Sequence, residues 1–202
     1  MGMKAQDSAD DAGGETPSAS DRARARWGLD RVRLLADDDT DLARALQRHL
    51  RHLPVVTLHD RLLPNGEIAA HLAIAPGGVT VIESAVDLAP PLTVQRLRGI
   101  FSAKAELLRD RDAADRTAAL VPVRERVALV RMLVGGEVSV AGALCLPDTP
   151  GLRPIRPLTV QGTLVGHAKP VAALAARDGD LSDMELASLA EHLHVSCPPA
   201  LS

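Results

Sequence analysis

The sequence predicts an α/β fold in which helices flank a mixed β-sheet. Apolar residues recur at helical spacing from Leu42 to Leu53, and a second helical period spans Val123 to Val134. Between them, short apolar segments from Val55 to Glu83 are bounded by turn residues, which is typical of strands. The resulting order is helix, three strands, helix and strand. With the elements expected after it, this order favours an α/β sandwich that has additional helices toward its carboxyl end.

The first helix has recognisable signals at both of its ends. The acidic run DDDTD, residues 37–41, suits the positive amino end of a helix, and Pro54 prevents the helix from continuing. Val55 to Leu58 then favours a strand, and Pro64-Asn65-Gly66 favours a turn. The chain is therefore expected to pass from a helix directly into a sheet.

A β-hairpin is expected next. Ile68 to Ile74 and Val79 to Glu83 are apolar segments that flank Pro76-Gly77-Gly78, a combination that predicts a tight turn between paired strands. After the hairpin, Phe101 to Arg109 has helix-forming composition, and its conformation is left open between helix and strand.

The second half of the chain has clearer boundaries. The helix of Val123 to Val134 is expected to end at Gly135-Gly136, because glycine is favoured just after a helix. A Ser-x-x-Glu capping box begins the last helix. The remaining expected elements are strands at 138–146 and 158–165, a helix that has Pro170 near its start and runs through Ala176, and the last helix from Ser182 to about His194.

Length and composition indicate a polar tail, residues 1–28, and one domain, residues 29–202. The chain is 46% hydrophobic, but Trp27 and Phe101 are its only aromatic residues. It therefore has few aromatic side chains with which a surface could stack unpaired bases. No apolar run approaches the ~20 residues of a membrane helix, and the polar start does not resemble a signal peptide. Cys145 and Cys197 are too few for a disulfide framework. We therefore expect a cytoplasmic protein without a membrane partner.

Charge is distributed unevenly, although the net charge is only -3. Residues 1–41 hold 10 acidic and 6 basic side chains, whereas residues 96–131 hold 9 basic and 5 acidic ones. A basic segment of this kind can attract a phosphate backbone, or it can be a solvated surface that contacts a protein. The candidate nucleic-acid-binding residues are Arg96, Arg98, Arg109, Arg111, Arg116, Arg124 and Arg126.

The segment from Leu58 to Ala85, LHDRLLPNGEIAAHLAIAPGGVTVIESA, resembles the NERD domain, a nuclease-related branch of the PD-(D/E)XK nuclease superfamily. Members of this family carry LHDRLLP, then N-I-D-H-L, then G-P-G-G-V-x-V-I-(D/E)-x-K. Shorter matches at Asp115-Arg116-Thr117 and in ALCLPD and LTVQGTLV extend the resemblance over roughly Leu29 to Pro199. It implies a restriction-endonuclease-like α-β-β-β-α-β core, a strand pair near Phe101 to Arg109, and an association with nucleic-acid processing.

Two positions that carry the chemistry of this family differ here. Ala70 stands where the resemblance places a metal-binding aspartate, and Ala85 stands where it places a lysine. In phosphodiester hydrolysis the acidic pair holds a divalent cation that polarises the phosphate, while the lysine positions the attacking water. Glu83 matches the second acidic position, but a single carboxylate is a weak metal site. Mg²⁺ or Mn²⁺ is expected only if residual nuclease activity persists.

The register of the hairpin decides which side chain faces Glu83. A four-residue loop from Ala75 to Gly78 pairs Ile74 with Val79 and places Ala70 across from Glu83. A three-residue loop places His71 there instead, because a one-residue slip moves every side chain to the other face. The four-residue loop agrees with the family pattern and is favoured.

Other family positions are also altered. The resemblance implies a Gly-Glu pair on the first helix, and Asp41 is a shortened replacement or a helix cap. It also implies a glutamine on the helix after the motif, where this chain has Arg124-Glu125-Arg126. Lys104 could stand in for the absent lysine, since a long side chain can reach the site from a neighbouring element.

We therefore predict a nuclease-related domain that has lost hydrolytic activity and serves as a nucleic-acid or protein binding or scaffolding module. No catalytic residue is assigned with certainty, and the vestigial positions are Asp41, Ala70, Glu83 and Ala85. The alternative is a residual metal-dependent nuclease that uses Glu83 with Asp41 and with either His71 or Lys104.

Overall fold

The structure, a computed structural model, describes residues 40–85, 88, 92–97, 105–109, 112–147 and 157–200, with the backbone alone described at 40, 41, 96, 97 and 105–107. The polar tail expected at 1–28 lies outside these residues. Along the chain the elements are α2 (Thr40–Leu50), β1 (Val56–Leu62), β2 (Ile68–Ala75), β3 (Gly78–Ser84), β4 (Thr93–Leu97), β5 (Ala105–Arg109), the 3-10 helix η2 (Thr117–Leu120), α3 (Val121–Val134), β6 (Val140–Cys145), β7 (Leu158–Val160), β8 (Thr163–Gly166), α4 (Ala168–Ala175) and α5 (Asp183–Ser196).

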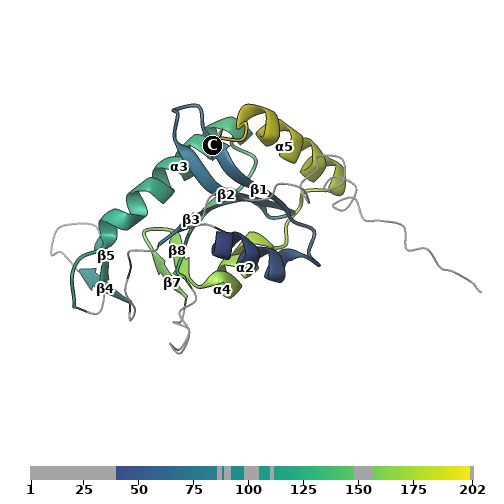
Figure 1. The fold of residues 1–202 in the computed structure, drawn as a ribbon. Coiled ribbons are helices and arrows are strands. Elements are labelled where there is room, and N and C mark those ends of the chain that lie inside the picture. The colour runs from purple at the N-terminus through teal and green to yellow at the C-terminus, as the bar shows by residue number, and fades with distance from the viewer. Residues whose placement is uncertain are drawn as a thin grey trace, which may run out of the picture.

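A mixed sheet with the strand order β1-β2-β3-β6-β8-β7 forms the centre of the described fold. Strands β1, β2 and β3 are antiparallel neighbours, while β3, β6 and β8 run parallel to one another. In Figure 1 the helices α3 and α5 lie on one side of this sheet and α2 and α4 lie on the other. The predicted α/β class with a mixed sheet between helices is therefore confirmed.

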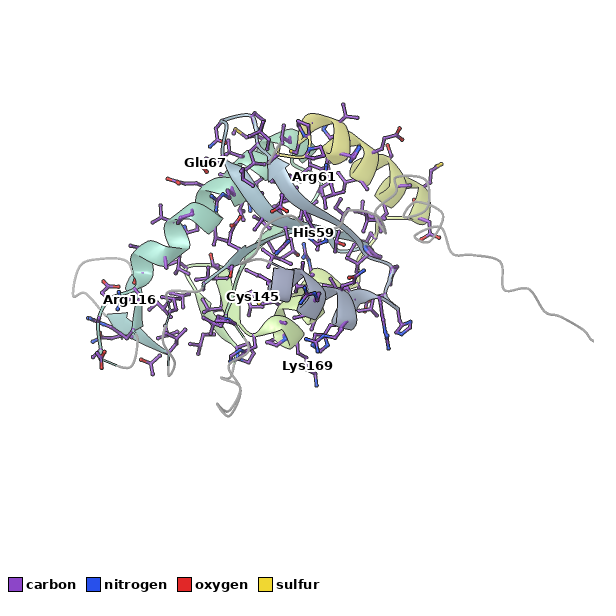
Figure 2. All side chains as sticks on the ribbon, viewed as in Figure 1. His59, Arg61, Glu67, Arg116, Cys145 and Lys169 are labelled. Atoms are coloured by element: carbon purple, nitrogen blue, oxygen red, sulfur yellow. The ribbon has the colours of Figure 1, made fainter. Side chains whose placement is uncertain are left out.

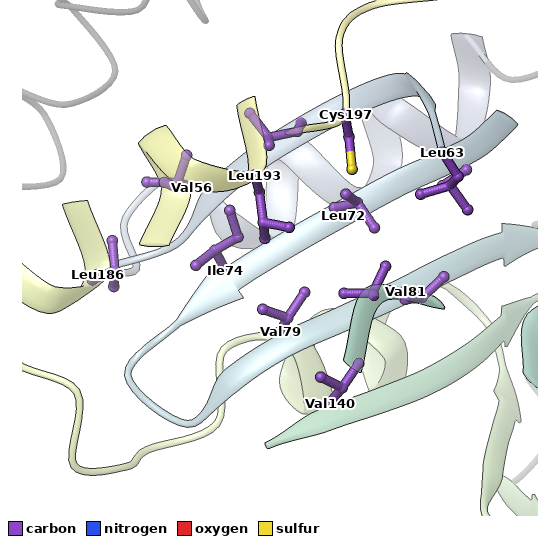
Figure 3. Close-up of a cluster of buried hydrophobic side chains, with 14 residues drawn as sticks. Val56, Leu63, Leu72, Ile74, Val79, Val81, Val140, Leu186, Leu193 and Cys197 are labelled. Atoms are coloured by element: carbon purple, nitrogen blue, oxygen red, sulfur yellow. The ribbon is translucent and has the colours of Figure 1, made fainter. Parts of the chain in front are cut away.

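Side chains alternate between the two faces of the strands, so the core has one layer on each side of the sheet. Under α3 and α5, side chains of β2 and β3 such as Leu72, Val79 and Val81 pack with Val130 and Leu193 of the two helices (Figure 3). The opposite face of the same strands contributes a second cluster, which packs against α2 and α4. Its members include Ala73, Ala75 and Ile82 from the sheet and Leu46, Leu50, Val171 and Ala175 from the helices.

The turn between β2 and β3 is held by a close backbone approach. Ile74 pairs with Val79, as the favoured loop predicts, and the strands extend one step further to the pair of Ala75 with Gly78. Gly78 has φ of +109°, and a Cβ atom there would lie 2.1 Å from the carbonyl oxygen of Ser139. Arg177 donates to the hydroxyl of Thr80 at 2.8 Å and to the Ser139 carbonyl at 3.3 Å. Gly78 therefore lets the turn approach the segment before β6, and Gly77 lets it approach Arg177 after α4.

The helix α3 also approaches the sheet closely at a glycine. A Cβ atom at Gly142 of β6 would lie 2.9 Å from Cγ1 of Val123 and 3.0 Å from Cγ2 of Val127. Because α3 connects the antiparallel part of the sheet to the parallel strand β6, this contact sets the height of α3 above β3. The height matters because it places Arg126 of α3 within reach of Glu83, near the end of β3.

Several local predictions are confirmed and one is corrected. The capping box is present, since Ser182 accepts from the backbone of Glu185 while the Glu185 side chain accepts from the backbone of Ser182. The expected strand at 158–165 is two strands, β7 and β8, joined by a turn at Gln161 and Gly162, where Gln161 has φ of +50°. The segment left open includes β5, which pairs with β4, whereas residues 98–104 lie outside the described chain.

Among the described residues, no helix is both long enough and apolar enough to span a membrane.

Candidate functional site

Glu83 lies near the end of β3 and faces α3. Its carboxylate is mostly buried, with 9% of the residue exposed. Oε2 lies 2.9 Å from Nη1 of Arg126, and Oε1 accepts from the backbone N–H of Ala70 at 3.4 Å. The carboxylate is therefore held between a guanidinium group and the backbone of β2. The positive charge beside it is supplied by Arg126.

Arg126 also approaches a second carboxylate. Its Nε atom lies 3.6 Å from Oε2 of Glu67, a residue of the turn between β1 and β2. The Glu67 side chain is 43% exposed, whereas the Arg126 side chain is 18% exposed. We therefore regard the contact with Glu83 as the stronger of the two, because it is shorter and because Glu67 is the more exposed carboxylate.

The two alanines of the motif are enclosed by the fold. Ala70 and Ala85 are 7% and 6% exposed, and the backbone N–H of Ala85 donates to the carbonyl of Cys145 at 2.9 Å. Ala85 belongs to an apolar cluster that lies at the amino end of α3. The cluster also contains Leu88, Leu92, Leu108, Leu120, Val123, Leu144, Leu146, Val160 and Val165. A lysine side chain at this position would have to displace apolar contacts or reach past them to Glu83.

The alternative in which His71 faces Glu83 is wrong. His71 pairs with Ile82 of β3 and with His59 of β1, so its side chain lies on the face of the sheet opposite Glu83. Nδ1 of His71 lies 2.7 Å from Nδ1 of His59, with the rings edge to face. The observed register separates His71 from the carboxylate, because side chains one residue apart point to opposite faces.

His71 is buried and His59 is half-buried, and both rings are electrically neutral near pH 7. Burial, and secondarily the neighbouring His59, lowers the pKa of His71 to about 3. Burial also lowers the pKa of His59, against the opposing influence of Asp60. One ring therefore donates to the other without either carrying a charge. This pair was missed from the sequence, where His59 and His71 are 12 residues apart in different strands.

Two predicted members of the site are not described with side chains. Asp41 lies in the first turn of α2, where only the backbone is described, and Lys104 lies in 98–104, outside the described residues. Their roles stay predictions.

The arginine-rich segment divides into different environments. Arg109 donates to Gln95 at 3.0 Å and to the carbonyl of Ala113 at 2.8 Å, and Arg124 donates to Gln161 at 2.6 Å. Arg116 is exposed at the corner beside η2 (Figure 2). Arg126 instead faces Glu83 and is largely removed from solvent. The side chain of Arg96 is not described, and Arg98 and Arg111 lie outside the described residues.

Acidic groups accompany the exposed arginines. Hydrogen bonds from Thr117 lower the pKa of Asp115, and the charge of Arg109 contributes in the same direction. Asp115 therefore stays ionised beside Arg109 and weakens the positive potential of this corner.

The donor set around Glu83 does not fit a divalent cation. Mg²⁺ requires several oxygen ligands, whereas Glu83 faces alanine at position 70 and a guanidinium group from α3. Across the described residues, no group of three or more His, Cys, Asp or Glu side chains is arranged to hold a metal ion. The Arg126–Glu83 contact was also missed from the sequence. Its signal was the departure from glutamine on the helix after the motif.

Comparison of this chain with protein-family models, with curated proteins and with solved structures finds no match.

Proposed function

We propose that the chain is a non-catalytic, nuclease-related domain of the NERD type with a restriction-endonuclease-like core, and that it serves as a binding or scaffolding module. The order helix, three antiparallel strands, helix and parallel strand supports the proposed core, with β4 and β5 as an inserted hairpin. One observation carries the loss of catalysis: the guanidinium of Arg126 lies 2.9 Å from Glu83, the one acidic residue of the motif that is retained.

The chemistry of this contact opposes hydrolysis. A guanidinium stays protonated, so it can neither accept a proton from water nor release one at neutral pH. It also places a positive charge where a metal would have to approach Glu83. Displacing it would leave Arg126 as a largely buried charge without its closest carboxylate, at a cost of about 3 kcal/mol or more.

Nuclease assays test this proposal directly. The full chain is incubated with plasmid and with single-stranded DNA in Mg²⁺ or Mn²⁺, beside the variant Glu83→Ala. We expect no metal-dependent cleavage by either protein, because neither holds the two acidic ligands. Cleavage by the natural chain that Glu83→Ala abolishes would overturn the proposal and favour a residual nuclease. The variant separates true activity from a contaminating nuclease, which would cleave equally in both samples.

For nucleic acid as the partner, the proposal relies on Arg109, Arg116 and Arg124, since Arg126 is engaged with Glu83. Binding of a fluorescent DNA duplex is measured by anisotropy at increasing salt, with the triple arginine-to-glutamine variant as comparison. Each lost phosphate contact should reduce the slope of log affinity against log salt by about 0.9. If the natural chain does not bind DNA even at low salt, a protein partner becomes the better proposal for the module.

A further inference from the structure

A buried arginine at the end of β1 has incomplete hydrogen bonding. Arg61 is 1% exposed, and within the described part of the chain its Nε and Nη1 atoms have no hydrogen-bond partner. A buried guanidinium without an acceptor is costly, because charge and N–H donors are removed from water together. Some acceptor is therefore expected beside it.

The backbone explains why Arg61 leaves the face occupied by His59. Asp60 has φ of +48°, in the left-handed region, which interrupts the regular alternation of β1. Arg61 pairs with Ala69, a member of the cluster under α3 and α5, and its charge interacts with Cys197, just beyond α5. Figure 3 shows Cys197 pointing from this segment toward the sheet.

A second unpartnered nitrogen lies on the same side of the sheet. His194, in the last turn of α5, has a buried Nδ1 atom for which the described residues supply no partner. Burial, and secondarily the charge of Arg61, lowers the pKa of His194. The unpartnered atoms of Arg61 can only donate, and Nδ1 of His194 can donate in one tautomer. The missing group is therefore an acceptor.

We propose that Arg61 and His194 form a binding site for a small oxyanion, enclosed by the end of α5 and the segment that follows it. An oxyanion suits Arg61 because the planar guanidinium presents N–H donors in the geometry that phosphate and carboxylate groups accept. It would also separate the charge of Arg61 from the His194 ring. The Asp60 carboxylate lies close enough to influence Arg61, yet neither Nε nor Nη1 of Arg61 donates to it.

An oxyanion would reach this site by opening of the segment 198–200. The contacts of this segment with β1 include the hydrogen bonds from Leu62 to the Pro198 carbonyl at 2.9 Å and from Ala200 to the Asp60 carbonyl at 2.8 Å, together with the bridge between Arg61 and Pro199. Short irregular segments that are held by few hydrogen bonds open locally at low free-energy cost. A bound oxyanion would hold this segment against β1, so anion binding and closure of the edge strand are coupled.

Hydrogen exchange of two amides reports this coupling. The full chain is studied at constant ionic strength while sodium chloride is replaced by sodium phosphate or by sodium acetate, and exchange at Leu62 and Ala200 is compared with exchange at Ala176. We expect saturable protection, reaching about tenfold at an anion concentration ten times the dissociation constant. Ala176, at the end of α4 on the other face of the sheet, should not respond. Protection by phosphate alone assigns a phosphate-type ligand, whereas protection by acetate as well assigns carboxylates to the same class.

Two variants decide whether the effect belongs to this site. Arg61→Met should abolish the response, and Arg48→Met, at an exposed position of α2, should keep it. Exchange that is the same in phosphate, acetate and chloride would mean that water fills the site and would overturn the proposal, as would a full response in Arg61→Met. If that variant does not fold, His194→Leu gives the decision: about tenfold weaker binding supports the site, and unchanged binding rejects it. The outcome is independent of nuclease ancestry, since no residue of the Glu83 region takes part.

Discussion

Arg126 and Arg61 are both arginines drawn into the interior, yet their surroundings differ. Arg126 reaches Glu83 at 2.9 Å and Glu67 at 3.6 Å, so its charge is matched by carboxylates. Arg61 is 1% exposed, and neither Nε nor Nη1 has an acceptor among the described residues. The difference indicates that the carboxylate of Glu83 is engaged in an internal ion pair, whereas Nε and Nη1 of Arg61 lack an acceptor within the described residues.

The strongest test of this comparison is to break the matched pair. Glu83→Ala leaves Arg126 largely buried without its closest carboxylate, and we expect the free energy of unfolding to fall by about 3 kcal/mol, measured by urea denaturation. Glu67→Ala is the matched control, because this more exposed partner should contribute less than about 1 kcal/mol. Equal effects from the two variants would contradict the assignment of Glu83 as the dominant partner.

His59 and His71 add a third case to the comparison, because these side chains are neutral near pH 7. The pKa of His71 is about 3 in the folded protein and near 6.5 when unfolded, so the unfolded state binds more protons between these values. The stabilising contribution is complete above about pH 6.5 and is lost as the pH falls, by about 2 kcal/mol at about pH 5. Denaturation curves across this range check the prediction. His71→Gln should flatten the dependence, and an unchanged profile would show that other groups control it.

The smallest expected effect concerns Arg61 without an added oxyanion. Replacing an unmatched buried guanidinium with an apolar side chain of similar length removes a desolvation cost, so Arg61→Met should leave stability unchanged or raise it by about 1 kcal/mol. The measurement is urea denaturation in chloride buffer. A loss of several kcal/mol would show that Arg61 already has strong partners in the folded protein, and the contrast with Arg126 would then disappear.

Much of the fold could be predicted because its signals are local. Pro54 lies just beyond the end of α2, the capping box at Ser182 begins α5, and the glycines after Val134 follow the end of α3. The register of Ile74 with Val79 was also predictable, since the hairpin loop and the apolar alternation agree. The split of 158–165 into β7 and β8 was missed, because Gln161 adopts the left-handed conformation that the sequence signalled only through Gly162.

The candidate site was harder to predict because its contacts join distant elements. Ala70, Glu83 and Ala85 could be placed together from one hairpin, but the partner of Glu83 comes from α3, more than 40 positions further on. The contact of His71 with His59 was missed for the same reason, because the two histidines lie in different strands and no local signal specifies their pairing.

The sequence by itself determined the α/β class, the hairpin register and the presence of alanine at positions 70 and 85, because these depend on residue identity and on periodicity. Only the tertiary structure decided that Arg126 matches the charge of Glu83, that His71 turns toward His59, and that Arg61 is buried beneath α5. Each of these depends on the crossing of elements far apart in the chain, where burial removes water and makes the choice of partner decisive.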